Sequence, residues 1–114
     1  MERRAPLALL HIRDAIVDFL AIVGSADAAE LASDRTRRYA AERCVEIISE
    51  ASRRIPEEWK AEHREIPWQD IAGIGSVLRH DYEDVNLEIL VKLRGPSLEA
   101  LERAVKALLA KYDI

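Results

Sequence analysis

The chain has 114 residues and a formal net charge of −4, so we expect a single domain over residues 1–114, without a general coat of nucleic-acid-binding charge. Hydrophobic residues make up 49% and charged residues 33% of it, which excludes a disordered chain. Its one cysteine excludes a disulfide framework and a zinc site built from several thiolates. No uncharged stretch approaches the roughly 20 residues of a membrane helix, and the first residues do not fit a signal peptide, so we expect a small cytoplasmic protein.

The four prolines each precede a segment with helical periodicity, and proline suits the first turn of a helix. These helix starts are Pro6, Pro56, Pro67 and Pro96. The first helix is predicted from about Pro6 to Val23 and ends at Gly24-Ser25. Its apolar stripe comprises Leu9, Ile12, Ile16, Phe19, Leu20 and Val23.

A short turn or helix is expected near Asp27–Leu31, and Asp34 is a plausible N-cap for a long second helix that ends near Ile55. The apolar face of that helix comprises Ala40, Cys44, Ile47, Ile48, Ala51 and Ile55. Cys44 on this face is expected to be a small core residue rather than a nucleophile.

A brief helical turn is predicted over Pro56–Glu62, and a third main helix begins at Pro67. A fourth begins near Asn86 and stops at Arg94-Gly95, and Pro96 starts the last. The core face of the third helix carries Trp68, Ile71, Ile74 and Leu78. Short connections between amphipathic helices predict an all-α fold, an antiparallel bundle of four to five helices.

Small residues and one histidine lie on the opposite side of the third main helix: Ala72, Gly73, Ser76 and His80. Two interpretations stay open. The small residues could allow a tight helix crossing within one chain, or they could form a second interface in a homodimer with His80 at its edge.

Arg79 and His80 together could carry chemistry. Histidine transfers protons near neutral pH, and arginine binds phosphate and stabilises charge in a phosphoryl transition state. Such a pair, without a metal, suffices to cleave RNA through its own 2′-hydroxyl. A solvated helix end is the alternative, and the pattern alone does not decide between them.

Three blocks resemble the HepT-like branch of the HEPN superfamily. Residues 41–51, AERCVEIISEA, are similar to the family's E-R-x-x-E-I-I-G-E-A helix. Ile66-Pro67-Trp68 followed by Ile71-Ala72-Gly73 forms the second block. In the third, Leu78-Arg79-His80-Asp81-Tyr82, the family has a His-x-Tyr ending. With the flanking amphipathic helices, the resemblance covers nearly the whole chain.

The resemblance implies a dimeric, metal-independent endoribonuclease, usually the toxin encoded beside a small nucleotidyltransferase antitoxin in a type VII-like system. That partner is thought to silence the toxin by adding adenylyl groups to the motif tyrosine, here Tyr82. His80 and an upstream arginine from both protomers would then line a cleft at the dimer interface, and no cofactor would be needed.

The chain departs from the family's R-N-x-L-x-H-x-Y pattern at one important place. Gly75 and Ser76 stand where the family has Arg and Asn. Arg79 lies one helical turn after Gly75, so we expect its long side chain to serve the same site. The alternative is that the loss of arginine at 75 marks a non-catalytic member that only binds its partner.

Other charged residues are weaker candidates. Arg43 and Glu50 could contact and orient RNA, with Ser76 as a third substrate-binding residue, although surface ion pairs explain the two charges equally well. A basic cluster, Arg35, Arg37 and Arg38, could meet RNA or an acidic partner, although a solvated run is the default interpretation. His11 and His63 have no matching ligand set, so no metal site is expected.

Two classes of function therefore remain. The first is an RNA-cleaving toxin with His80 and Arg79 as catalytic residues and Tyr82 as its modification site. The second is a non-catalytic dimeric partner of a nucleotidyltransferase. The net charge favours the second, and the intact His-x-Tyr favours the first.

Overall fold

Every element in the described part of the chain is helical. The computed structural model describes residues 4–80 and 84–112; for residues 4, 77–80 and 84–86 it describes the helix backbone but not the side chains. The elements are α1 (Arg4–Val23), α2 (Ala28–Ser33), α3 (Arg35–Ser52), α4 (Glu57–Lys60), the 3₁₀ turn η1 (Ala61–His63), α5 (Trp68–His80), α6 (Asp84–Leu93) and α7 (Pro96–Lys111). Within these residues no helix has the length and apolar character needed to span a membrane.

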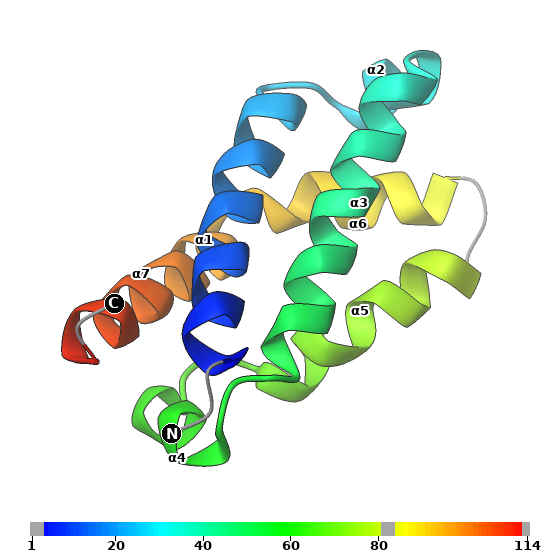
Figure 1. Ribbon diagram of the computed structural model, residues 1–114. Coiled ribbons are helices and arrows are strands. Elements are labelled where there is room, and N and C mark those ends of the chain that lie inside the picture. The colour runs from blue at the N-terminus through cyan, green and yellow to red at the C-terminus, as the bar shows by residue number, and fades with distance from the viewer. Residues whose placement is uncertain (1–3, 81–83, 113–114) are drawn as a thin grey trace.

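Helices α1 and α3 run side by side in opposite directions and form the centre of the bundle (Figure 1). Helix α7 packs against α1, α6 packs against α2 and α3, and α5 crosses α3 near its C-terminal end. The all-α prediction is confirmed. The helices predicted near Asn86 and from Pro96 are also present, as α6 and α7.

The core is centred on α1. Leu9, Ile12, Ile16, Phe19 and Val23 have no exposed surface, as their stripe predicted. The prediction was wrong for Leu20, which is 40% exposed. Ala15 is also buried and lines a groove shared with α3, so the buried side of α1 is rotated toward α3 relative to the predicted stripe. This rotation turns Leu20 toward the surface.

Helix α3 buries two of its sides because it packs against both α1 and α5. Its buried residues are Ala41, Cys44, Val45, Ile48, Ser49, Ala51 and Ser52. Ala40 and Ile47, which were predicted for the apolar face, are only half-buried. Helix α3 ends at Ser52 rather than near Ile55, because the backbone tightens into i→i+3 hydrogen bonds and the residue before Pro56 disfavours helix.

Side chains satisfy free backbone groups at the end of α1 and at the starts of α2 and α3. Asp27 caps α2, and Asp34 accepts a hydrogen bond from the Arg37 backbone N–H at 3.0 Å, which confirms it as the N-cap of α3. Gly24, with φ of +53°, ends α1. The Arg37 guanidinium then donates to the carbonyls of Ile22 at 2.6 Å and Val23 at 2.9 Å. Arg37 of the basic cluster therefore has a structural role.

The end of α7 is tied to the α4–η1 segment. Tyr112 stacks on Trp59 with ring centroids 4.0 Å apart, and the Tyr112 hydroxyl donates to Glu62 at 2.6 Å. Lys111 also donates to Glu62. These hydrogen bonds, first from Lys111 and then from Tyr112, lower the pKa of Glu62. Trp59, Glu62, Lys111 and Tyr112 thus form a clamp that joins the end of α7 to the segment before α5.

Candidate functional site

The signature residues lie at the C-terminal end of α5. His80 is the last residue of this helix and Arg79 immediately precedes it. Their side chains, and Tyr82 as a whole, lie outside the described residues. The described part of this region comprises the earlier turns of α5 and the helix on which they pack, α3.

Ser49 joins α3 to α5 through a buried hydroxyl. This side chain is only 3% exposed. Its hydroxyl donates to the Ala72 carbonyl at 2.8 Å and accepts from the Gly75 N–H at 3.3 Å. Because buried polar groups must find partners, these two hydrogen bonds set the position of α5 on α3.

Arg53 makes a second link to the same point of α5. It follows Ser49 by four residues and is the C-cap of α3, one helical turn further along. Its terminal nitrogen donates to the Ala72 carbonyl at 2.6 Å. One carbonyl of α5 is thus held by a buried hydroxyl and by an exposed guanidinium.

The small residues of α5 divide between two environments. Ala72 and Gly75 meet α3 through Ser49, so part of the small-residue surface forms a tight crossing within the chain. A Cβ added at Gly73 would meet nothing within 4 Å, so that position is open. Ser76 is half-buried. The crossing within the chain is therefore observed, and the open side at Gly73 leaves room for a second interface.

Arg43 and Glu50 line a different hollow, a groove of about 390 Å³ between α1 and α3. The α1 side contributes His11, Asp14 and Asp18. Burial, and secondarily Asp18, raises the pKa of the Cys44 thiol at the floor, in keeping with its predicted core role. Arg43 lies 3.8 Å from Glu46, and Glu50 lies 3.0 Å from Arg54.

The groove and the α5 contact occupy different sides of α3. At 100° per residue, Ser49 lies about 100° around the helix from Glu50, and Arg53 is rotated by a similar angle from Arg54. Ser76 does not line the α1–α3 groove. Contact of RNA with Arg43 and Glu50 stays a prediction.

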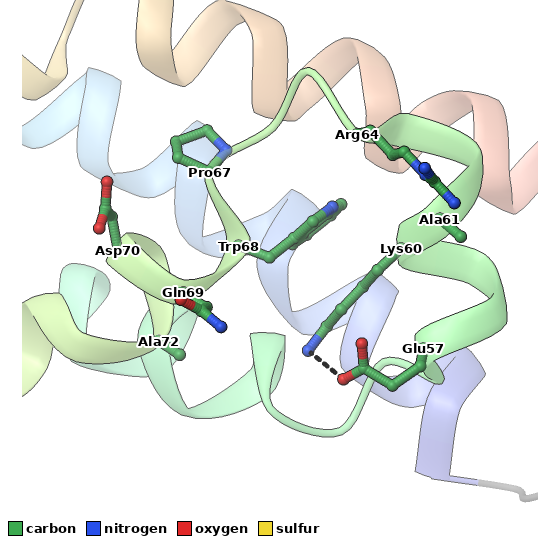
Figure 2. Close-up of a pocket in the computed structure, with 9 residues that line it drawn as sticks. All are labelled: Glu57, Lys60, Ala61, Arg64, Pro67, Trp68, Gln69, Asp70 and Ala72. Carbon is green, nitrogen blue, oxygen red and sulfur yellow. Dashed lines mark ion pairs between the residues drawn. The ribbon is translucent and has the colours of Figure 1, made fainter.

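A third hollow, of about 560 Å³, lies between the α4–η1 segment and the start of α5. Figure 2 shows Lys60 reaching back to Glu57, whose carboxylate lies 3.6 Å from it. Arg64 and Asp70 also line this hollow, so its charges balance. Trp68 forms part of the wall and donates its indole N–H to the His63 carbonyl at 3.0 Å. Trp59 is buried, and so is Trp68, which the sequence placed on the core face of this helix.

The other side of α5 faces an apolar hollow of about 240 Å³, where Ile71 and Ile74 lie opposite Leu98 and Leu101 of α7. In the described part of the chain, no three His, Cys, Asp or Glu side chains gather in a way that could hold a metal ion. Of these three hollows, the one between α5 and α7 is mainly apolar and the other two carry charges of both signs.

Arg53 was not predicted from the sequence, and Ser49 was noted only as part of a motif. Their spacing of four residues was a usable signal, because it places a small polar residue and an arginine on one side of α3. What the sequence could not supply was the identity of the helix that this side meets.

Comparison with known proteins shows the family to which the chain belongs. The sequence profile described as "Ribonuclease HepT-like" matches residues 12–108. A protein from Caldanaerobacter subterraneus subsp. tengcongensis named "Putative RNase" is 38% identical over 69 residues, 60% of this chain and 62% of the relative. "Probable ribonuclease HepT" of Thermococcus cleftensis is 41% identical over 59 residues, 52% of this chain and 54% of the relative.

A longer match links the chain to another protein named "Putative RNase", from Methanocaldococcus jannaschii. It is 27% identical over 107 residues, 93% of this chain and 98% of the relative. The first two matches thus span less than two thirds of the relatives' lengths, and this one spans nearly all. No solved structure matches the chain.

Proposed function

Because the chain belongs to the Ribonuclease HepT-like family, we propose that it is a metal-independent endoribonuclease, the toxin of a type VII-like toxin–antitoxin pair. The observation that carries this proposal is the position of Arg79 and His80 in the last turn of α5, inside the matched region. A base and a cation on one helical turn are the groups that RNA cleavage without a metal requires.

The chemistry is an internal transfer. His80 takes the proton of a ribose 2′-hydroxyl, and the 2′-oxygen forms a bond to the adjacent phosphorus. The bond from phosphorus to the 5′-oxygen breaks, and that oxygen receives a proton from a second histidine or from water. Arg79 stabilises the negative charge on the phosphoryl oxygens. The products are a 2′,3′-cyclic phosphate and a 5′-hydroxyl.

The active form in this proposal is a homodimer. The open position at Gly73 supports a second protomer lying against this side of α5, with His80 at the edge of the interface. Ser76, four residues before His80, would contact the RNA within the cleft. Arg43 and Glu50 would contact RNA that extends onto the α1–α3 groove.

Regulation in this proposal uses Tyr82. A cognate nucleotidyltransferase transfers the adenylyl group of a nucleoside triphosphate to the Tyr82 phenol oxygen, and pyrophosphate leaves. The modified residue lies two positions after His80, so the bulky, negatively charged group would block access of RNA phosphate to the same helix end.

A second candidate is a non-catalytic, dimeric binding partner of the nucleotidyltransferase. It is favoured by one specific observation: position 75 carries a buried glycine against Ser49 where the family pattern has arginine. In this alternative the protein contributes an interface and no chemistry.

The test is cleavage of RNA by the purified protein in excess EDTA, for wild type and for His80→Ala. We expect cleavage by wild type and a loss of roughly 100-fold or more in the variant, the usual range for removing general acid–base catalysis. Folded, dimeric, unmodified wild type that leaves RNA intact would favour the binding partner instead. The melting temperatures of both proteins are measured to exclude unfolding as the cause.

A further inference from the structure

The Arg53 side chain brings a positive charge from the C-cap of α3 to the surface of α5. Arg53 is an exposed residue, yet its terminal nitrogen lies 2.6 Å from the Ala72 carbonyl oxygen. A guanidinium has five N–H donors in a planar fork, and this contact uses one of them. Within the described residues, none of the ion pairs includes Arg53. The guanidinium therefore retains donors for a further anionic group.

The contact between Arg53 and Ala72 lies within α5, before the end of the helix that carries His80. A helix carbonyl points toward the C-terminal end, where the residue four positions later donates its N–H. The oxygen of Ala72 therefore points toward the level of Gly75 and Ser76, and a guanidinium bound to it lies beside these two residues. His80 follows Ser76 by one more turn, a rise of about 6 Å along the axis.

The Arg53 guanidinium lies at the level of Gly75, where α5 has no side chain of its own. Gly75 is buried, so the helix itself supplies no charge at this level. The Ser49 hydroxyl holds the Gly75 N–H and the Ala72 carbonyl and so fixes α5 against α3 at this point. The positive charge at this level of α5 comes from Arg53, the C-cap of α3.

We propose that Arg53 is a catalytic residue of the ribonuclease site, which binds the scissile phosphate and stabilises the charge that develops on it. This inference rests on the proposed function. The free N–H groups of Arg53 donate to the non-bridging oxygens of the phosphate while His80, one turn beyond Ser76, handles the proton of the 2′-hydroxyl. Planar, bidentate donation is the geometry in which arginine binds phosphate most strongly.

Arg53 also has a structural contact, so the test must separate charge from hydrogen bonding. Arg53→Gln keeps an N–H donor for the Ala72 carbonyl and removes the charge. Arg53→Lys keeps the charge and removes the planar fork. The matched control is Arg103→Gln, which removes the same charge from an exposed position on α7.

Three quantities are measured for each protein: melting temperature, affinity for a single-stranded RNA with 2′-O-methyl groups, and cleavage rate of the same RNA with free 2′-hydroxyls in EDTA. We expect Arg53→Gln to melt like wild type and bind the blocked RNA several-fold more weakly, with a salt dependence reduced by roughly one phosphate contact. Its cleavage rate should fall roughly 100-fold, the usual loss when a transition-state donor is removed. Arg53→Lys should retain binding and lose part of the rate, and Arg103→Gln should match wild type.

The outcomes distinguish this inference from the proposed function. Arg53→Gln that binds and cleaves like wild type overturns the role of Arg53 and leaves the ribonuclease proposal intact. A loss in Arg53→Ala that Arg53→Gln fully restores also overturns it, because the role would be structural. Wild type that binds blocked RNA but never cleaves overturns the ribonuclease, and weaker binding by Arg53→Gln would then still support phosphate contact. Wild type that does neither overturns both.

Discussion

Helix α3 makes different kinds of contact with its two neighbours, α1 and α5. Toward α1, α3 meets a continuous apolar core in which Phe19 and Ile16 have no exposed surface. Toward α5, the contact is made by the Ser49 hydroxyl and the Arg53 guanidinium on one carbonyl, while Ile71 and Ile74 of α5 stay half-buried beside an apolar hollow. The helix that carries His80 is thus anchored by the buried Trp68 at its start and by directed hydrogen bonds at its middle, whereas α1 and α3 meet through a continuous apolar surface.

The two kinds of contact contribute differently to stability and to the orientation of α5. Apolar burial is non-directional and supplies most of the folding free energy, whereas hydrogen bonds fix the height and rotation of a helix. In the proposed ribonuclease, His80 needs its helix held in one orientation, and directed hydrogen bonds meet that requirement. Substitutions on the two sides of α3 should therefore have different consequences.

The largest expected effect is on the apolar side. Phe19→Ala should lower the free energy of unfolding by about 3–5 kcal/mol, because it opens a cavity in a fully buried cluster. Ile74→Ala should cost only about 1–2 kcal/mol, because Ile74 is half-buried beside an existing hollow. Urea denaturation of both variants measures the difference. Equal losses would mean that α5 is as tightly packed as α1.

An intermediate effect is expected at Ser49. Ser49→Ala should cost about 1–2 kcal/mol, since the Ala72 carbonyl and the Gly75 N–H lose a buried partner. The control is Ser52→Ala, because Ser52 is equally buried but its hydroxyl donates within its own helix, to the Ser49 carbonyl at 2.7 Å. Hydrogen exchange should show faster opening of α5 amides in Ser49→Ala alone. Faster exchange spread evenly over all helices would contradict the directed attachment of α5.

The smallest effect concerns the clamp between α7 and η1. The hydrogen bonds from Lys111 and Tyr112 lower the pKa of Glu62 below its ordinary value of 4.5, so they stabilise the fold fully above that pH. This contribution is lost as the pH falls from 4.5 through the lowered folded pKa. In urea titrations from pH 7 to pH 3, the stability gap between wild type and Glu62→Gln should stay constant down to about pH 5 and then shrink.

The matched control for the clamp is Glu88→Gln, on the exposed side of α6. Its stability gap from wild type measures the effect of losing one exposed carboxylate outside the clamp. A gap between wild type and Glu62→Gln that widens with acid would contradict the direction of the Glu62 pKa shift.

The helices themselves were predictable, because prolines, caps and apolar periodicity are local signals. Asp34 and Gly24 act as the sequence indicated. Leu20 and Ala40 were placed wrongly, because a stripe shows that a helix has a buried side but not how many partners share it. The position of Arg37 shows the same limit, since its partners are the end carbonyls of a helix 14 and 15 residues away.

The candidate site was predictable in its motif and not in its surroundings. The pattern around His80 led to the family, and the family profile supports it. The role of Ser49 and Arg53 depends on α5 crossing α3 at Ala72, a contact between residues 19 and 23 positions apart. A substitution such as glycine at 75 can be interpreted only when the residue facing it is known, and here that residue is Ser49.

The most direct test of the proposed chemistry is the identity of the RNA ends produced in EDTA. Attack by the ribose 2′-hydroxyl must leave a 2′,3′-cyclic phosphate and a 5′-hydroxyl, and mass spectrometry of a short defined RNA distinguishes these from other termini. We predict those ends for wild type, none for His80→Ala, and none for an RNA whose 2′-hydroxyls are replaced by hydrogen. Products with a 3′-hydroxyl and a 5′-phosphate would contradict the account, because they require attack by water rather than by the RNA itself.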